Sequence, residues 1–296
     1  MERTRKEDKK VSVIIPIYNG EKYIEETVRS VLAQNYRNLE VLCIIDGTKD
    51  ASKEILLAIG DPRLVVLEKE NRGATFRRNE GAEHIAKGQY LWFLDQDDVI
   101  APDCIGAAVQ ELERTGSAAV AVNGNLIDSN SNVIRRMYRV NKPVLTLNKL
   151  MKGNQLFTTS QVLVKKKVFV KLGGFSLDAG IADDWDMWIR LLRAGEKMVF
   201  LDRQLMGYRL HDNNNSRNLE KMLKSEMHIV EKTLDKVGDP KKIKSYSYMR
   251  YSSRAADWKS LSTAVSLNSS LLLSPRFYLT ACHIMIARMK KNGGAA

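Results

Sequence analysis

Three aspartates follow one apolar segment of the chain almost without interruption. Residues 90–94 (YLWFL) form a strand-like run, and Asp95, Asp97 and Asp98 come directly after it. Asp95 and Asp97 are two residues apart in a turn, so carboxylate oxygens from both can face one point. Hard oxygen ligands of this kind suit Mg²⁺ or Mn²⁺, which often carry the phosphates of a substrate. A second interpretation is an acidic turn that only caps a helix beginning after Pro102.

The elements that must position these carboxylates alternate between strand and helix. Strand-like apolar runs lie at 11–17, 39–45, 64–68 and 90–94, and helical patterns lie at 21–34, 52–59 and 74–86. This alternation, at a spacing of about 25 residues, predicts βαβ units and a mostly parallel sheet. The strands contain Val, Ile and Leu on both faces, which predicts a sheet covered on both sides.

The pattern loosens in the second half of the chain. We predict helices at 102–115 and 184–194, and strands at 118–123 and 161–164. From about residue 217 the sequence is helical in pattern and basic. The chain therefore divides into a charged N-terminal tail (1–10), an α/β domain (11–216) and a basic helical C-terminal extension (217–296).

The carboxyl ends of parallel strands are where open α/β sheets bind ligands. Asp46 ends the second strand-like run as Asp95 ends the fourth, so two separate carboxylates point to one rim. The sequence contains neither G-x-x-x-x-G-K-[ST] nor G-x-G-x-x-G, the glycine-rich phosphate-binding motifs. A nucleotide bound at this rim would need a metal to hold its pyrophosphate.

Charge and cysteine content narrow the partners and the compartment. The net charge is +12, and residues 240–291 contain ten Lys or Arg against a single acidic residue, Asp257. Such a segment favours a membrane surface, a phosphorylated substrate or nucleic acid, or is simply well solvated. The three cysteines form no CxxC pair, and an odd number favours a reducing compartment. Without a signal-peptide pattern or an apolar stretch of about 18 residues, we expect a cytoplasmic protein.

Several ordered motifs resemble those of family 2 glycosyltransferases. They are VSVIIPIYNGEKYIEETVRSVLAQNY (11–36), NRGATFRRNEGAEHIAKGQYLWFLDQDD (71–98), GGF (173–175) and DDWDMWIRL (183–191). The resemblance covers about residues 11–215. It implies a GT-A type fold, with a Rossmann-like mixed, mostly parallel sheet flanked by helices, here followed by the helical extension.

The resemblance implies a donor site at the first strand ends. Pro16, Tyr18 and Asn19 match the motif that holds the nucleotide base and ribose, and Asp46 matches the aspartate that accepts a hydrogen bond from the base. The family commonly has two acidic residues at the end of the second strand, whereas this chain has Ile45 in place of the first. Base recognition then rests on Asp46, and the base itself stays open.

The resemblance also implies a metal site. Asp95 and Asp97 match the DxD motif, in which Asp97 is the expected ligand of Mn²⁺ or Mg²⁺ and Asp95 contacts the ribose or the metal. His211 lies where the family often has a histidine near the diphosphate or metal, and a purely structural histidine is the equal alternative.

Three arginines precede the acidic turn in the sequence. Arg72, Arg77 and Arg78 are candidates for contact with the donor phosphates, and Arg78 is the one we select. The competing interpretation is that most of them are ordinary surface arginines.

Asp184 matches the acidic residue that acts as general base in inverting members of the family. Its neighbour Asp183 would raise the pKa of Asp184 by like-charge proximity. The alternative for both is a pair of helix N-terminal acids stabilised by the helix dipole. On the same helix, Trp188 could stack on a sugar, but the spacing of Trp185 and Trp188 favours core positions.

These features predict an inverting enzyme that moves one sugar from a nucleoside diphosphate sugar, with UDP-sugars favoured. The acceptor is a hydroxyl of a glycan or a lipid-linked molecule, and surface polysaccharide assembly is a plausible setting. The QxxRW motif of processive synthases is absent after residue 195, which argues for single-sugar transfer. The alternatives are a non-catalytic nucleotide-sugar binder and a nucleic-acid-binding protein. For the latter we find no recognisable motif, so we expect no nucleic-acid partner.

The C-terminal residues raise a separate expectation. Residues 276–291 (RFYLTACHIMIARMKK) contain an apolar stretch of about 13 residues that ends in basic ones and is too short to span a bilayer. It either lies on an anionic membrane surface, making the protein peripheral on the inner face of the membrane, or packs on the α/β domain.

Overall fold

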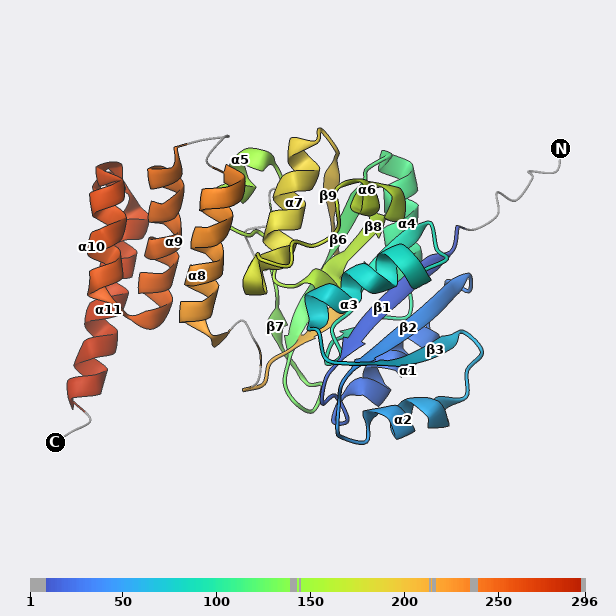
Figure 1. Ribbon diagram of the computed structural model, residues 1–296. Coiled ribbons are helices and arrows are strands. Elements are labelled where there is room, and N and C mark those ends of the chain that lie inside the picture. Colours follow the sequence, from blue (N-terminus) through green and yellow to red (C-terminus); the bar gives the residue numbers. More distant parts are fainter. Residues whose placement is uncertain are drawn as a thin grey trace.

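A single mixed sheet runs through the molecule, with helices on both faces and a block of helices at one end (Figure 1). The computed structural model describes residues 9–138, 143, 145–212, 214, 217–234 and 239–293. Of the predicted N-terminal tail, residues 1–8 lie outside this description. The strand order is β3-β2-β1-β4-β8-β6-β9-β5, and β7 pairs with β6.

The first half of the sheet is the predicted parallel unit. Its strands are β1 (Val11–Ile17), β2 (Leu39–Asp46), β3 (Leu64–Lys69) and β4 (Tyr90–Phe93). The connecting helices are α1 (Ile24–Leu32), α2 (Ser52–Ile59) and α3 (Ala74–Glu80), which continues as a π-helix over Gly81–Ile85. Strands β1, β2 and β4 are buried throughout. Our expectation of two covered faces is wrong for β3, which is partly exposed because it is the edge strand.

The second half of the sheet is mixed. Strand β8 (Val162–Lys165) runs antiparallel between β4 and β6 (Ala119–Ile127), and β9 (Met198–Arg209) runs parallel to β6. The short strands β5 (Val99–Ile100) and β7 (Val133–Arg136) pair with β9 and β6. The sequence patterns missed β9, because the polar run at 202–204 interrupts its apolar alternation, and the pairing with β6 is irregular at Asn123.

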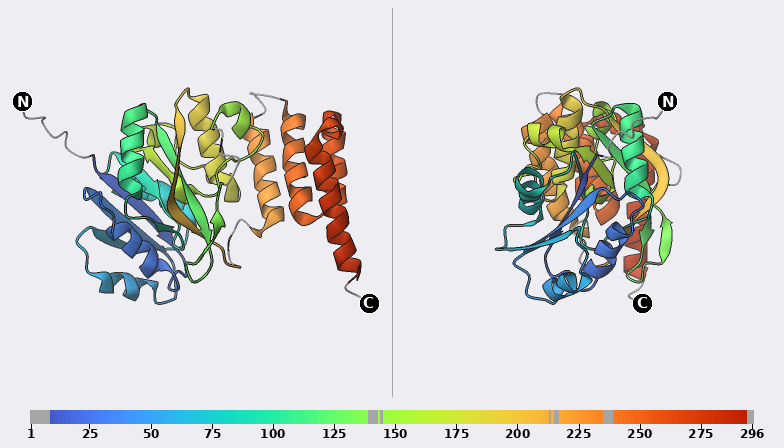
Figure 2. Two further views of the ribbon diagram at one scale, coloured as in Figure 1. Left: turned by 180° about the vertical axis from the view of Figure 1, so that it is seen from behind. Right: turned by 90° about the vertical axis from the view of Figure 1, so that its right-hand side faces the viewer.

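Two hydrophobic cores cover the two faces of the sheet. Helices α1, α2 and α4 (Cys104–Thr115) pack on one face. Helices α3, α6 (Lys166–Lys171) and α7 (Asp183–Arg193) pack on the other, and the small helix α5 (Leu147–Leu150) joins them. Figures 1 and 2 show these two layers from opposite sides. Trp185 and Trp188 on α7 are fully buried in the second core, as their helical spacing predicts.

The C-terminal helices form a compact block beside the sheet (Figure 2). They are α8 (Leu219–Ile229) with a π-helical turn at Val230–Leu234, then α9 (Pro240–Ala255), α10 (Trp258–Leu267) and α11 (Pro275–Gly293). Asp239 and Asp257 cap α9 and α10 by accepting backbone N–H groups. No helix in the described part of the chain is long and apolar enough to cross a membrane.

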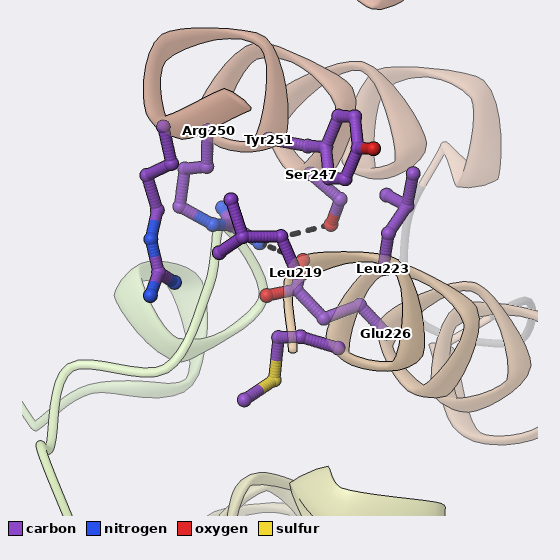
Figure 3. Close-up of a pocket in the computed structure, with 8 residues that line it drawn as sticks. Leu219, Leu223, Glu226, Ser247, Arg250 and Tyr251 are labelled. Carbon is purple, nitrogen blue, oxygen red and sulfur yellow. Dashed lines mark hydrogen bonds and ion pairs between the residues drawn. The ribbon is translucent and has the colours of Figure 1, made fainter. Parts of the chain in front are cut away.

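Side chains of this block reach the sheet domain. Ile229, Val230 and Ile243 join the second core, whereas Met249, Leu261 and Ile284 belong to a small core within the block. Arg250 on α9 donates to Glu226 on α8 and to Ser247, and these three residues help to line a hollow of about 30 Å³ between the two helices (Figure 3). Arg250 also donates to the carbonyl of Lys152 in the sheet domain. The block is therefore docked on the sheet domain and not only tethered to it.

Candidate active site

The strand-end carboxylates lie at one rim of the sheet, as the sequence predicts. Strands β2 and β4 both pair with β1 in parallel, so Asp46 at the end of β2 and Asp95 just after β4 share the carboxyl edge. The three aspartates after β4 do not cap α4, which begins only at Cys104 after Asp103. The capping interpretation is therefore wrong, because each of these carboxylates has a partner elsewhere at the rim.

Asp46 is buried and holds a loop. Its carboxylate accepts hydrogen bonds from the backbone N–H groups of Arg72 (2.8 Å) and Gly73 (2.7 Å) and from Nε of Arg77 (2.7 Å). These donors take up both carboxylate oxygens, so the loop before α3 is fixed to the end of β2. The role of Asp46 as a contact to the base stays a prediction.

The residues predicted to hold the base and ribose surround the end of β1. Pro16 lies beyond Ile14, the last residue of β1 that pairs with β4, so its missing N–H disturbs no pairing there. Tyr18 is half-exposed, and its backbone exchanges two hydrogen bonds with the side chain of Gln96. Asn19 has a left-handed backbone (φ 52°) and bonds Thr48 through both its N–H and its side-chain oxygen.

Arg78 links two acidic segments that are far apart in sequence. Its Nη2 donates to Asp95 Oδ1 at 2.5 Å, and its Nη1 lies 3.4 Å from Asp183 Oδ2 at the start of α7. Thr75 donates to the same Asp183 oxygen at 2.6 Å, and Thr158 donates to Asp95. The guanidinium therefore ties the acidic turn to the helix that carries Asp184.

The surface interpretation of the arginines is wrong for two of the three. Arg77 and Arg78 are buried, and each pairs with an aspartate of the rim. Arg72 is exposed, and its guanidinium lies 3.5 Å from the centre of the Phe76 ring. Buried arginines of this kind are compensated by the carboxylates they contact, since an unpaired buried charge is costly.

Asp97 and His211 meet although they are far apart in the sequence. Asp97 Oδ2 and His211 Nε2 are 2.6 Å apart, and each side chain is 18% exposed. The His211 ring stacks on Tyr23 of the loop before α1, with centroids 5.5 Å apart. A carboxylate with an imidazole beside it is a donor pair that suits a transition ion such as Mn²⁺ better than Mg²⁺, which prefers oxygen ligands alone. Within the described ranges, no three acidic, His or Cys side chains converge on one point.

Arg209 was not singled out from the sequence, yet it organises the acidic turn. It is fully buried at the end of β9, where its backbone N–H donates to Asp98 and its Nε donates to the carbonyl of Asp97. Its Nη2 donates to Glu26 at 2.7 Å.

Asp98 Oδ2, the carboxylate oxygen that Arg209 does not contact, is buried without a hydrogen-bond partner in the described structure. Burial, with the charges of Asp97 and Asp95, raises the pKa of Asp98. Because Arg209 lies two residues before His211, the sequence could have suggested that it lies near the predicted metal site.

Asp184 lies in the first turn of α7, beside the arginine-linked network. Its Oδ2 accepts a hydrogen bond from Asn154 (2.9 Å), and its Oδ1 accepts one from the N–H of Trp185 (2.7 Å). Burial raises the pKa of Asp184 to about 7, and the charge of Asp183 adds to the rise, as expected from the sequence. Asn154 and the charge of Arg78 act in the opposite direction. The carboxyl therefore titrates near neutral pH.

Asn79 on α3 contacts the GGF segment (173–175) that leads toward α7. Its side chain accepts from the N–H of Phe175 (2.9 Å) and donates to the carbonyl of the same residue (2.7 Å). Gly174 has a positive φ (65°), and a Cβ there would lie 2.6 Å from Asn79 Oδ1. Arg190 of α7 donates to the carbonyl of Gly174 from the other side. The loop that leads into α7 is thus clamped to α3, next to Arg78.

The carboxyl-edge site and the mixed sheet define a GT-A type glycosyltransferase fold. The family model "Glycosyl transferase family 2" matches residues 12–176, more than half of the chain, and the chain belongs to this family. An uncharacterized glycosyltransferase of Rickettsia typhi is 32% identical over 208 residues, which is 68% of this chain and 64% of that protein. The chain therefore spans less than two thirds of the length of that relative.

Solved structures agree with the fold. Staphylococcus aureus TarS 1-349 in complex with UDP-GlcNAc superimposes with a TM-score of 0.64 at 18% identity, over 93% of this chain and 80% of that one. A mannosyltransferase of Pyrobaculum calidifontis in complex with GDP-Man and Mn²⁺ gives a TM-score of 0.63 at 18% identity, over 96% of this chain and 87% of that one. At these identities the likeness supports the fold alone.

Proposed function

We propose that the protein transfers one sugar, with inversion, from a nucleoside diphosphate sugar to a hydroxyl of a glycan or lipid-linked acceptor. The observation that supports the proposal is that two sets of side-chain contacts lie at the carboxyl edge of the sheet. Asp97 lies against His211, while Arg78 joins Asp95 to the helix start that holds Asp184. UDP-sugars are favoured as donors, because two TarS complexes among the structural neighbours contain UDP or UDP-GlcNAc. Surface polysaccharide assembly is the setting we favour.

We assign each residue of the donor site a role from its position. Pro16, Tyr18 and Asn19 would border the base and ribose, with Asp46 as the contact to the base. Arg78 would face the diphosphate side of the site, where its charge is already shared between Asp95 and Asp183.

Asp97 and His211, now joined by a 2.6 Å hydrogen bond, would hold a divalent ion once that hydrogen bond opens, and Asp95, two residues before Asp97, would be a further carboxylate ligand. When bound, Mn²⁺ or Mg²⁺ would neutralise negative charge on the departing diphosphate. The Mn²⁺ in the Pyrobaculum calidifontis complex supports a divalent ion in a protein of this fold.

Asp184 would act as the general base. The acceptor oxygen forms a bond to the anomeric carbon, its proton passes to the Asp184 carboxylate, and the bond to the diphosphate oxygen breaks with its electron pair. A base works best when its pKa is near the working pH, and the pKa of Asp184 is about 7. Asn154 and the Trp185 amide hold the carboxylate in one orientation, and Asp183 is occupied by Thr75 and Arg78.

The domain division at residue 217 and a peripheral membrane location complete the proposal. Apolar side chains of α11 and the turn before it are exposed, including Leu273 (87%), Leu279 (72%) and Met289 (72%), and the adjoining sequence is basic. Flotation with anionic vesicles tests the location: Leu273→Asn/Leu279→Asn should lose vesicle binding, whereas Leu57→Asn on α2, a leucine that is 61% exposed, should keep it. Equal flotation of all three proteins would mean that α11 does not provide the membrane contact, and a wild-type protein that does not float would contradict the peripheral location.

Isothermal titration of UDP, GDP and dTDP, each with Mn²⁺ and with EDTA, tests the donor site. We expect one nucleotide to bind only with metal, and Asp97→Ala to abolish this binding. Asp61→Ala, an ion-paired aspartate beside Arg63 at the opposite end of the sheet, is the matched control and should bind as the wild type does. If no nucleotide binds the wild-type protein, the proposal is wrong.

A further inference from the structure

A lysine-lined groove lies at the opposite end of the sheet from the aspartates. Its volume is about 790 Å³, and its walls come from the segment before β1, the start of β4, the end of α4 and helix α6. Six lysines line it: Lys9, Lys87, Lys165, Lys166, Lys167 and Lys171. No function considered so far uses these residues.

The positive charge of the lysine groove is poorly compensated. Glu113 is the one acidic residue of its lining, and it pairs with Lys9 at 2.8 Å, so six lysines less one glutamate leave a surplus of five charges. Glu40 is buried behind the wall, where it accepts from Ser12 and from the N–H of Lys87.

The other lysines of the groove have no carboxylate partner among the described residues. Lys165 and Lys166 donate to the carbonyls of Gly116 and Ala86, contacts that orient the groups without neutralising them. For Lys87, Lys167 and Lys171, the described residues provide no carboxylate partner within ion-pair distance. The groove therefore concentrates like charges that repel one another until an anion enters.

The shape and size of the groove restrict what can neutralise it. Lysines stand on more than one wall of a hollow, so a flat membrane surface would reach only its rim. A single phosphate can pair with only a few of the six lysines, which come from three segments of the chain. A narrow chain with repeated negative groups can do so, and exposed Val170 on α6 provides an apolar wall for the uncharged parts of such a chain.

We propose that the lysine groove is a binding site for a linear polyanion that carries phosphate or carboxylate groups. Strand β1 spans seven residues, so about 20 Å separate the groove from the donor site. A long acceptor held in the groove would raise its own effective concentration at the strand ends. This role as an acceptor exosite rests on the proposed function, whereas the binding of the polyanion does not.

The test is fluorescence polarisation of labelled long-chain inorganic polyphosphate with the full chain. Lys167→Glu/Lys171→Glu reverses two charges of the groove, and Lys221→Glu/Lys224→Glu reverses two exposed charges on α8. Because both variants change the net charge equally, we expect at least about a tenfold loss of affinity in the first and less than about twofold in the second. Nucleotide binding with Mn²⁺, measured on the same samples, should be unchanged in both.

Three competitors identify the class of ligand. Inorganic phosphate at the same concentration of phosphate groups should not displace the polyphosphate. Vesicles of phosphatidylglycerol and phosphatidylcholine in equal parts should bind both variants alike. Single-stranded DNA should bind more weakly than polyphosphate.

Equal losses in the two variants would overturn the proposal, as would displacement by phosphate alone, vesicle binding that depends on Lys167 and Lys171, or a preference for DNA. A wild-type protein that binds polyphosphate but no nucleotide would refute the proposed function and leave the lysine groove standing.

Discussion

The two ends of the sheet treat charge in opposite ways. At the carboxyl end, buried arginines and aspartates neutralise one another: Arg77 with Asp46, and Arg78 with Asp95 and Asp183. At the amino end, Lys165 and Lys166 of the groove donate to backbone carbonyls, and Lys87, Lys167 and Lys171 have no ion-pair partner among the described residues. The first arrangement holds a site in shape before a ligand arrives, whereas the second leaves most of its charge for a ligand to neutralise.

This difference has an energetic consequence. A buried ion pair contributes little net stability when intact but is costly to break, because one charge is left buried without a partner. Replacing an exposed charge changes the free energy of unfolding little, because the charged group is solvated by water in both the folded and the unfolded state. Substitutions should therefore affect both folding and catalysis at the carboxyl end, but only ligand binding at the amino end.

The largest expected effect concerns the proposed base. Asp184→Asn should lower the rate of nucleotide release from the donor in the presence of acceptor by about 10²- to 10⁴-fold, with donor binding retained. For the wild type, the rate should rise with pH and level off above about pH 7, since the base must be deprotonated. A variant that keeps the wild-type rate and pH profile would remove Asp184 from the mechanism.

The same carboxyl gives a stability prediction with a defined sign. The folded-state pKa of Asp184 lies above the usual value for an aspartate, so the folded protein holds this proton more tightly than the unfolded chain. Its contribution to the free energy of unfolding should be present below about pH 4 and be lost as pH rises to about 7. Asp184→Asn should therefore raise the melting temperature at pH 8 more than at pH 5, and the reverse order would contradict the assignment.

Arginine removal at one end and lysine removal at the other test the comparison directly. Arg78→Met should lower the free energy of unfolding by about 3–5 kcal/mol, because Asp95 and Asp183 lose their shared cation. Lys9→Met breaks a half-exposed pair with Glu113 and should cost less than about 1 kcal/mol. Urea unfolding measures both. Similar values would show that the two ends do not differ in this way.

Two glycines, one near each end of the sheet, allow the stability cost of an added methyl group to be compared. Gly116 near the groove and Gly174 near the active site both have a positive φ, 66° and 65°, so an alanine is strained at either position. Gly116→Ala meets nothing within 4 Å and should cost about 1 kcal/mol. Gly174→Ala also displaces Asn79 and should cost about 1–2 kcal/mol more in thermal unfolding. Equal costs would mean that the Asn79 clamp yields without loss.

The smallest effect is expected in the groove itself. Lys167→Ala/Lys171→Ala should leave the melting temperature and the nucleotide affinity at wild-type values, because neither ammonium group has an ion-pair partner in the described structure. Differential scanning calorimetry and the titration with UDP and Mn²⁺ check this. A clear drop in stability would indicate that these lysines have a structural role.

Local patterns were enough to predict much of the fold. The parallel direction of β1 to β4 follows from apolar runs and intervening helical periodicity, both of which depend on neighbours in sequence, whereas their order in the sheet was not predicted. The helices α2 and α7 were predicted to within a residue or so for the same reason. Strand β9 was missed, because its stability comes from pairing with β6 and β5 and not from an alternating pattern of its own.

The sequence by itself determined which residue types gather at the strand ends: aspartates after β2 and β4, and an acidic pair at the start of α7. Only the tertiary structure decided which of them meet. Arg78, which contacts Asp95, reaches Asp183 across 105 residues, and His211 reaches Asp97 across 114 residues. Six lysines from three segments likewise become one groove. Spacing along a chain carries no information about such contacts, since they depend on how strands and helices pack.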